Sequence, residues 1–109
     1  MGTTTVDLFR VGNASGPRLE KVRPGIDIEV YRKDGEDWVK GRSGGASTFE
    51  SKKDTRKTWW RLPAGTKYDD RLFVWNDQDD HWSWEPASDM RLLDYVSALE
   101  AVNVDFTRV

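Results

Sequence analysis

Strand-like runs occupy most of this chain, and its single helix-like run comes last. Ile26, Ile28 and Val30 alternate with polar residues in the period-two pattern of a half-buried strand. Asp34-Gly35 is a turn signal, and residues 36–40 then return as a second strand-like run, so the pair predicts a hairpin. A chain organised in this way favours antiparallel pairing of short strands over a helical bundle.

Further β-forming segments are separated by turn residues. The segment 51–57 carries five charges in seven positions and is predicted to be a loop or a single turn. The acidic stretch 76–80 is predicted to be the turn of a second hairpin. The remaining predicted strands are residues 6–11, 46–49, 58–62, 72–75 and 81–84.

The hydrophobic period changes near Pro86. Leu92, Tyr95, Val96 and Leu99 recur at the spacing of one helical face. Ser88 or Asp89 is the expected N-cap of this helix, because a short polar side chain can accept a hydrogen bond from the first turn. The last apolar residues, Val104 and Phe106, are predicted to form an edge strand or to pack under the sheet. Strands followed by one helix predict a mostly antiparallel α+β domain.

The size and composition fit one domain with a single core. The chain has 109 residues, no cysteine, six tryptophans and a net charge of -2, with 33% charged residues. The absence of cysteine excludes disulfides and thiolate metal sites, and the aromatic residues can supply most of the core volume, with three or four of the tryptophans expected there. The first residues lack the pattern of a signal peptide, and no run is long enough to cross a bilayer, so we expect a cytoplasmic protein.

The common catalytic motifs are missing. A single histidine excludes a His-rich metal site, and the acidic residues near it are more simply a solvated turn, so no metal is expected. No G-x-S-x-G elbow is present and His81 is the only available base, which argues against a serine triad. Among the many acidic residues, no pair stands out as the two carboxylates of a glycoside hydrolase.

Three segments nevertheless carry chemistry. Arg10 lies within an aromatic strand, where a guanidinium is unfavourable unless it faces a cleft or an anion, and its planar fork suits a phosphate. In residues 44–49, Gly-Gly-Ala-Ser-Thr-Phe, two glycines permit a close backbone approach directly before two hydroxyls. His81 begins another aromatic strand. Each feature also has a structural explanation: an ion pair, a loop and a satisfied side chain.

In their order and spacing, these segments resemble the small ADP-ribosyltransferase-like toxins typified by a cytosol-acting effector of bacterial type VI secretion. The resemblance covers nearly the whole chain. It rests on Leu-Phe-Arg-Val at 8–11, the loop from 13 to 24, Gly-Gly-Ala-Ser-Thr-Phe at 44–49, Leu-Pro-Ala-Gly-Thr at 62–66, and His-Trp-Ser-Trp-Glu-Pro-Ala at 81–87 leading to Asp-Met at 89–90.

The resemblance implies one domain over residues 1–109, with a strongly bent, split β core whose cleft holds NAD as a substrate. Arg10 would hold a phosphate or a ribose. Ser47 and Thr48 would support the nicotinamide ribose, with Phe49 packed beneath them. The implied chemistry is transfer of ADP-ribose, or hydrolysis of NAD.

The same resemblance assigns the later strand and the glycines. His81 and Trp82 would offer a ribose contact and a stacking face, and Gly45 would let the backbone approach the ligand. Transferases of this kind commonly use a glutamate on a late strand to grip the nicotinamide ribose. Glu85 is the first candidate here and Glu50 the second, and neither stands clearly at that position in the pattern.

Partners and rival functions follow from the same observations. An immunity protein that plugs the cleft and an unknown ADP-ribose acceptor are the implied partners, and delivery would use a specialised secretion system. One alternative is a catalytically inactive relative that acts by binding a protein. Another is a module that binds single-stranded nucleic acid through tryptophans and nearby basic residues. The mixed charges and acidic balance argue against nucleic acid.

Overall fold

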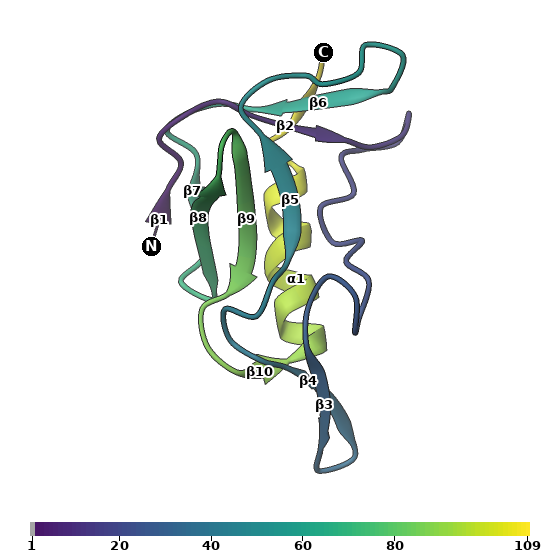
Figure 1. The fold of residues 1–109 in the computed structure, drawn as a ribbon, viewed down its shortest axis with the longest axis vertical. Helices are drawn as coiled ribbons and strands as arrows, with labels where there is room; N and C mark the ends of the chain where they lie inside the picture. The colour runs from purple at the N-terminus through teal and green to yellow at the C-terminus, as the bar shows by residue number, and fades with distance from the viewer. Residues whose placement is uncertain (1) are drawn as a thin grey trace.

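A bent antiparallel sheet of six strands forms the centre of the molecule, and helix α1 packs against it (Figure 1). The structure is a computed structural model and describes residues 2–109. Its elements are β1 Gly2–Thr3, β2 Leu8–Val11, β3 Val30–Lys33, β4 Glu36–Val39, β5 Ala46–Phe49, β6 Trp59–Leu62, β7 Lys67–Tyr68, β8 Leu72–Gln78, β9 His81–Pro86, β10 Met90–Arg91, α1 Leu92–Asn103 and β11 Thr107–Arg108.

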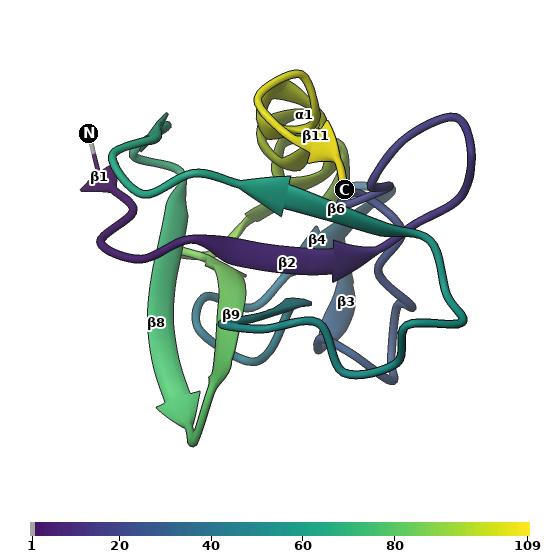
Figure 2. The same ribbon diagram turned by 90° about the horizontal axis from the view of Figure 1, so that it is seen from above.

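The large sheet has two halves that meet at β2 and β5. Its strand order is β11-β6-β2-β5-β9-β8, and β2 pairs with β5 only at Phe9 and Phe49. On either side of this junction the ladders are longer: β2 and β6 share four residue pairs, as do β5 and β9. Figure 2 shows the β2–β6 half crossing the direction of β8 and β9. The sheet is therefore weakly joined at its centre.

The core lies between the sheet and α1. Tyr95 and Leu99 are buried as predicted, and Ala98 and Val102 complete the buried stripe of the helix, whereas Leu92 and Val96 of the predicted face are only partly buried. They pack with buried sheet residues that include Trp84. Helix α1 has 12 residues, and no helix within residues 2–109 is both long and apolar enough to span a membrane. The expected α+β architecture, mostly antiparallel with a C-terminal helix, is confirmed.

The first hairpin is confirmed, but its leading strand begins later than the sequence pattern predicts. Strand β3 starts at Val30, because Ile26 lies in a turn and is 73% exposed. Gly25 adopts a φ of 80° in this turn, and the carboxylate of Asp27 accepts hydrogen bonds from the backbone N–H and side chain of Arg23. Local hydrogen bonding thus overrides the alternation of isoleucines. Strands β3 and β4 form an arm that projects from the body (Figure 1).

The second hairpin is longer than predicted. Strand β8 continues through Gln78, so the turn is confined to Asp79 and Asp80 rather than to residues 76–80. Asp79 accepts the left-handed conformation that the tight turn requires, with a φ of 47°. The register shifts between Asn76 and Gln78, which places a β-bulge within the strand.

The predicted N-cap of the helix is wrong. Arg91 occupies the cap position and makes no side-chain capping hydrogen bond. The carboxylate of Asp89 instead accepts hydrogen bonds from the backbone N–H of Gly41 (2.8 Å) and the hydroxyl of Tyr31 (2.7 Å). Between Asp89 and the helix, β10 pairs with β4, so strand pairing moves the helix start beyond either predicted cap.

The C-terminal residues and most of the tryptophans are placed largely as predicted, against the sheet and in or near the core. Phe106 is buried, and the following strand β11 pairs with β6, whereas Val104 is 84% exposed. Trp59 and Trp84 are buried, and two further tryptophans pack partly buried against the core. Trp75, in contrast, is 42% exposed.

Replacement of Tyr95 with Phe is predicted to destabilise the fold and to change its response to alkaline pH. The buried hydroxyl donates to the carbonyl of Trp84 over 2.6 Å, so its loss should lower the free energy of unfolding by about 1–2 kcal/mol at neutral pH. Burial raises the pKa of Tyr95. Above about pH 10 the unfolded chain therefore releases a proton that the folded chain keeps, and stability falls as the pH rises.

Urea unfolding of wild type and Tyr95→Phe between pH 7 and 11 would measure both effects. The wild type should lose stability more steeply than the variant above pH 10. Equal slopes in the two proteins would show that Tyr95 does not carry this alkaline sensitivity.

Candidate functional site

Ser47 stands at the centre of the candidate site. Nη1 of Arg10 donates to the backbone carbonyl of Ser47 over 2.8 Å, and Nε2 of His81 lies 2.9 Å from its Oγ. The three residues come from β2, β5 and β9, which are neighbours in the sheet. Two residues that are distant from Ser47 in the sequence, Arg10 and His81, therefore both contact it.

The guanidinium of Arg10 bridges the opening between the two halves of the sheet. Within residues 2–109 it donates to three backbone carbonyls: those of Ser47, Pro17 (3.0 Å) and Arg18 (3.0 Å). Desolvation by burial lowers the pKa of Arg10, an effect partly opposed by the charges of Glu20 and, more weakly, other groups. A guanidinium has five N–H groups, so two take no part in these three bonds.

Residues that are adjacent in the sequence point to opposite faces of the sheet. Strand register puts Ser47 opposite Ser83, and the hydroxyl of Ser47 bonds to His81 on the same face. Thr48 points the other way and is fully buried: it donates to the carbonyl of Trp82 (3.2 Å) and accepts from the indole of Trp84 (3.0 Å). We call the Ser47 side, which α1 does not cover, the helix-free face (Figure 1).

The aromatic candidates divide in the same way. Phe49 lies on the helix-free face, with its ring in edge contact with His81 (5.4 Å between centroids) and Trp59 (6.3 Å). It therefore forms an apolar wall beside the imidazole. Trp82 follows His81 directly along β9 and so projects from the other face, where its indole donates to Glu50 over 2.8 Å.

The two candidate carboxylates occupy different environments. Glu85 alternates in phase with His81 and Ser83, which puts it on the helix-free face, and it is 4% exposed. Its Oε2 accepts from the indole N–H of Trp75 over 2.9 Å. Glu50 is exposed and is bonded to a tryptophan of the opposite face. Only the first of these acids shares a face with Ser47.

Gly44 and Gly45 let other atoms come close to the backbone that leads into β5, and in this structure those atoms belong to the protein itself. Gly44 has a φ of 133°, and a side chain there would collide with the carbonyl of Asp27. At Gly45 a side chain would collide with the carbonyl of Trp84 and the hydroxyl of Tyr95. Both positions thus bring β5 against the core and the preceding loop.

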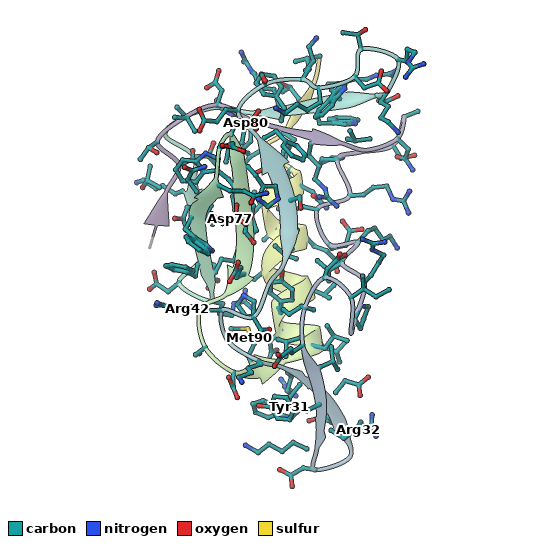
Figure 3. All side chains as sticks on the ribbon, viewed as in Figure 1. Tyr31, Arg32, Arg42, Asp77, Asp80 and Met90 are labelled. Atoms are coloured by element: carbon teal, nitrogen blue, oxygen red, sulfur yellow. The ribbon has the colours of Figure 1, made fainter. Side chains whose placement is uncertain are left out.

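Asp77 is a member of the site that sequence reasoning assigned to a solvated turn. Its carboxylate is hydrogen-bonded to Nδ1 of His81, and Figure 3 shows it beside β8 and β9. The bulge between Asn76 and Gln78 sets two residues of β8 against His81. The four-residue spacing from Asp77 to His81 across a predicted hairpin was the available signal.

A cavity of about 460 Å³ lies behind Arg10, between the loop from 13 to 20 and the end of α1. It is lined by groups that include Pro17, Arg18 and Trp60. The Arg10 guanidinium donates to the carbonyls of Pro17 and Arg18, so it is tied to the rim of this cavity as well as to Ser47.

Several basic residues near the tryptophans have acidic partners. Arg32 bonds Asp37 at 2.8 Å, and Lys53 is ion-paired with Asp80. Such pairing reduces the positive potential that a nucleic-acid surface needs. Within residues 2–109, no cluster of three or more potential His, Asp or Glu ligands is arranged to hold a metal ion.

Comparison with known proteins identifies one family. The model of a family described as Tse2 ADP-ribosyltransferase toxin matches residues 6–108, which is nearly the whole chain. No curated protein and no solved structure matches the chain.

Arg10→Lys is predicted to destabilise the fold. A lysine ammonium cannot span carbonyls on β5 and on the 17–18 loop, so we expect the free energy of unfolding to fall by about 2–4 kcal/mol. Arg61→Lys on the adjacent strand is the matched control, since Arg61 is exposed and lies 3.9 Å from Asp7. Urea unfolding of both variants would measure the difference, and equal stabilities would argue against the bridging role.

Gly45→Ala is predicted to lower stability by about 1–3 kcal/mol, because the new methyl group would push β5 away from Trp84 and Tyr95. Gly16→Ala is the control, since a side chain at Gly16 would meet nothing within 4 Å. Thermal unfolding followed by tryptophan fluorescence would compare them. A Gly45→Ala protein as stable as the Gly16→Ala protein would contradict the packing argument.

Proposed function

Because the chain belongs to the Tse2 ADP-ribosyltransferase toxin family, we propose that it is a toxin that uses NAD in the cytosol of a target cell. In this proposal residues 1–109 form one toxin domain with a split, ADP-ribosyltransferase-type core. The bond between nicotinamide and C1′ of its ribose breaks, and its electron pair leaves with nicotinamide. An acceptor nucleophile, or water, then bonds C1′ and loses its proton.

The observation that carries the proposal is the shared face of Ser47, His81 and Glu85. As nicotinamide leaves, positive charge develops on the ribose, and a fixed carboxylate stabilises that charge most strongly where water is excluded. Glu85 is 4% exposed and lies on the same face as the Ser47–His81 pair. This supports Glu85 over Glu50 as the acid that grips the ribose.

The other residues would position the substrate. Ser47 and His81 would contact the nicotinamide ribose, and Phe49 would supply an apolar wall beside them. Arg10 would set the position of Ser47 and offer its two remaining N–H groups to a phosphate. Thr48, Gly45 and Trp82 would act through the core and strand placement, since their contacts lie on the other side of β5 and β9.

Trp75 sets a condition for substrate binding. Its indole N–H holds the carboxylate of Glu85 and its ring is 42% exposed, so a ribose hydroxyl would have to replace this hydrogen bond. The exposed ring would then be free to cover the ligand. An immunity protein would block the same face, and delivery into the target cell would rely on a specialised secretion system.

Glu85→Gln is predicted to reduce nicotinamide release from NAD by roughly 10²-fold or more, because the amide lacks the charge that stabilises the transition state. Chromatography of NAD incubated with purified protein and a bacterial lysate would measure it. Glu100→Gln, on the exposed side of α1, is the matched control and should retain full activity.

Isotope-labelled NAD in the same lysate would distinguish the two reactions. Label on a macromolecule indicates transfer, and free ADP-ribose indicates hydrolysis. Failure of the wild type to release nicotinamide under these conditions, with growth arrest on expression, would favour a relative that acts only by binding.

A further inference from the structure

A hydrogen-bonded series of serine, histidine and aspartate lies on the helix-free face. Oγ of Ser47 is 2.9 Å from Nε2 of His81, and Nδ1 of the same imidazole is bonded to the carboxylate of Asp77. All three side chains retain some exposure, and those of His81 and Asp77 are 21% and 28% exposed. Reagents in solution can therefore reach the series.

Strand register explains how the series forms without a nucleophile elbow. Phe49 is paired with His81, so Ser47 and His81 are diagonal neighbours on one face of two adjacent strands. On the other side of His81, the bulge sets Asp77 and Gln78 against it. Two ladders of the sheet thus deliver the serine and the aspartate to opposite ends of one imidazole.

The chemistry of the three groups fixes the direction of the hydrogen bonds. An ionised carboxylate only accepts, so the bond to Asp77 keeps the proton of a neutral imidazole on Nδ1. Nε2 then presents a lone pair, and the hydroxyl of Ser47 donates to it. This is the arrangement in which histidine acts as a general base toward serine, which is recognised by geometry and not by sequence order.

We propose that Ser47 is an activated nucleophile that reacts with small carboxylic esters, with His81 as its base and Asp77 as a positioning residue. Oγ bonds the ester carbonyl carbon while its proton passes to Nε2. The carbon–oxygen bond to the leaving group then breaks, and Nε2 returns the proton to the departing oxygen. Water, deprotonated by the same nitrogen, then bonds the acyl carbon; the bond from that carbon to Oγ breaks, the acid leaves, and Nε2 returns the proton to Oγ of Ser47.

The surroundings favour a small ester with an apolar part. The partly exposed ring of Phe49 stands 5.4 Å from the imidazole and is backed by the buried ring of Trp59, 6.3 Å away. An aryl or short acyl group can pack against this wall. The proposed reaction with esters rests on these contacts and does not involve NAD. It can therefore be tested without NAD, and its outcome is independent of the proposed function.

The test uses two probes on the purified protein: p-nitrophenyl acetate, and a fluorophosphonate that phosphonylates activated serines. We expect one label per chain, mapped by peptide mass spectrometry to Ser47, and a burst of p-nitrophenol. Ser47→Ala should abolish both signals, and His81→Gln should slow labelling by roughly 10²-fold. Ser97→Ala, at an exposed position of α1, should label like the wild type.

Asp77→Asn separates positioning from structure. We expect labelling to slow by roughly 10²-fold or more, because the amide can donate to Nδ1 and so stabilise the unproductive tautomer. His81 is the only histidine of the chain, so the nitrogen NMR signals of its imidazole report that tautomer without overlap. They should show Nδ1–H in the wild type and Nε2–H in the variant.

Peptide mapping of the wild type keeps the proposal falsifiable even if a variant unfolds. No labelling of Ser47 in the folded wild type would overturn it, as would a label on another serine. An Asp77→Asn protein with unchanged labelling and an unchanged histidine spectrum would overturn the role of Asp77.

Discussion

The junction between the two halves of the large sheet depends on the guanidinium of Arg10, which stands in for missing backbone pairing between β2 and β5. Strands β2 and β5 are joined by a single residue pair, and beyond it no residue of β2 is paired with Ser47, so the ladder offers the Ser47 carbonyl no backbone donor from β2. Arg10 supplies that donor and ties the 17–18 loop to the same point. Burial of the cation is unfavourable, as its lowered pKa indicates, but three charge-assisted hydrogen bonds offset it. The sheet can therefore open at its centre without leaving a buried carbonyl unpaired.

This interaction also gives one short strand two separate tasks. Along β5, Ala46 and Thr48 point into the core, whereas Ser47 and Phe49 point to the helix-free face. The backbone of Ser47 is held by Arg10 and its hydroxyl by His81. A chain of 109 residues has little surface to spare, so the residues that define the core and those that form the candidate site alternate along the same strands.

That alternation explains what sequence reasoning could and could not find. The hairpins, the helical stripe and the family could be predicted, since period, turn residues and ordered motifs are local properties. Treating Ser47 with Thr48, and His81 with Trp82, as pairs in one cleft ignores the strand pleat, which sends neighbours to opposite faces. The role of Asp77 was not predicted, because its position depends on a β-bulge that the sequence does not reveal. Asp89 was wrongly predicted as a helix cap, because its hydrogen-bond partners, Gly41 and Tyr31, are distant in the sequence.

Asp77 links the two proposed chemistries of this face. A serine hydroxyl has one proton, and when the imidazole carries its own proton on Nδ1 the acceptor of that serine proton is Nε2 of His81. With that proton engaged, the lone pairs of Oγ are directed outward, where they can accept from a ribose hydroxyl or attack an ester carbon. Attack on an ester requires an unprotonated Nε2, and between the two tautomers of a neutral imidazole the carboxylate of Asp77 selects the one with its proton on Nδ1. The orientation of the Ser47 hydroxyl in one reaction and nucleophilic attack in the other are thus both set by this tautomer.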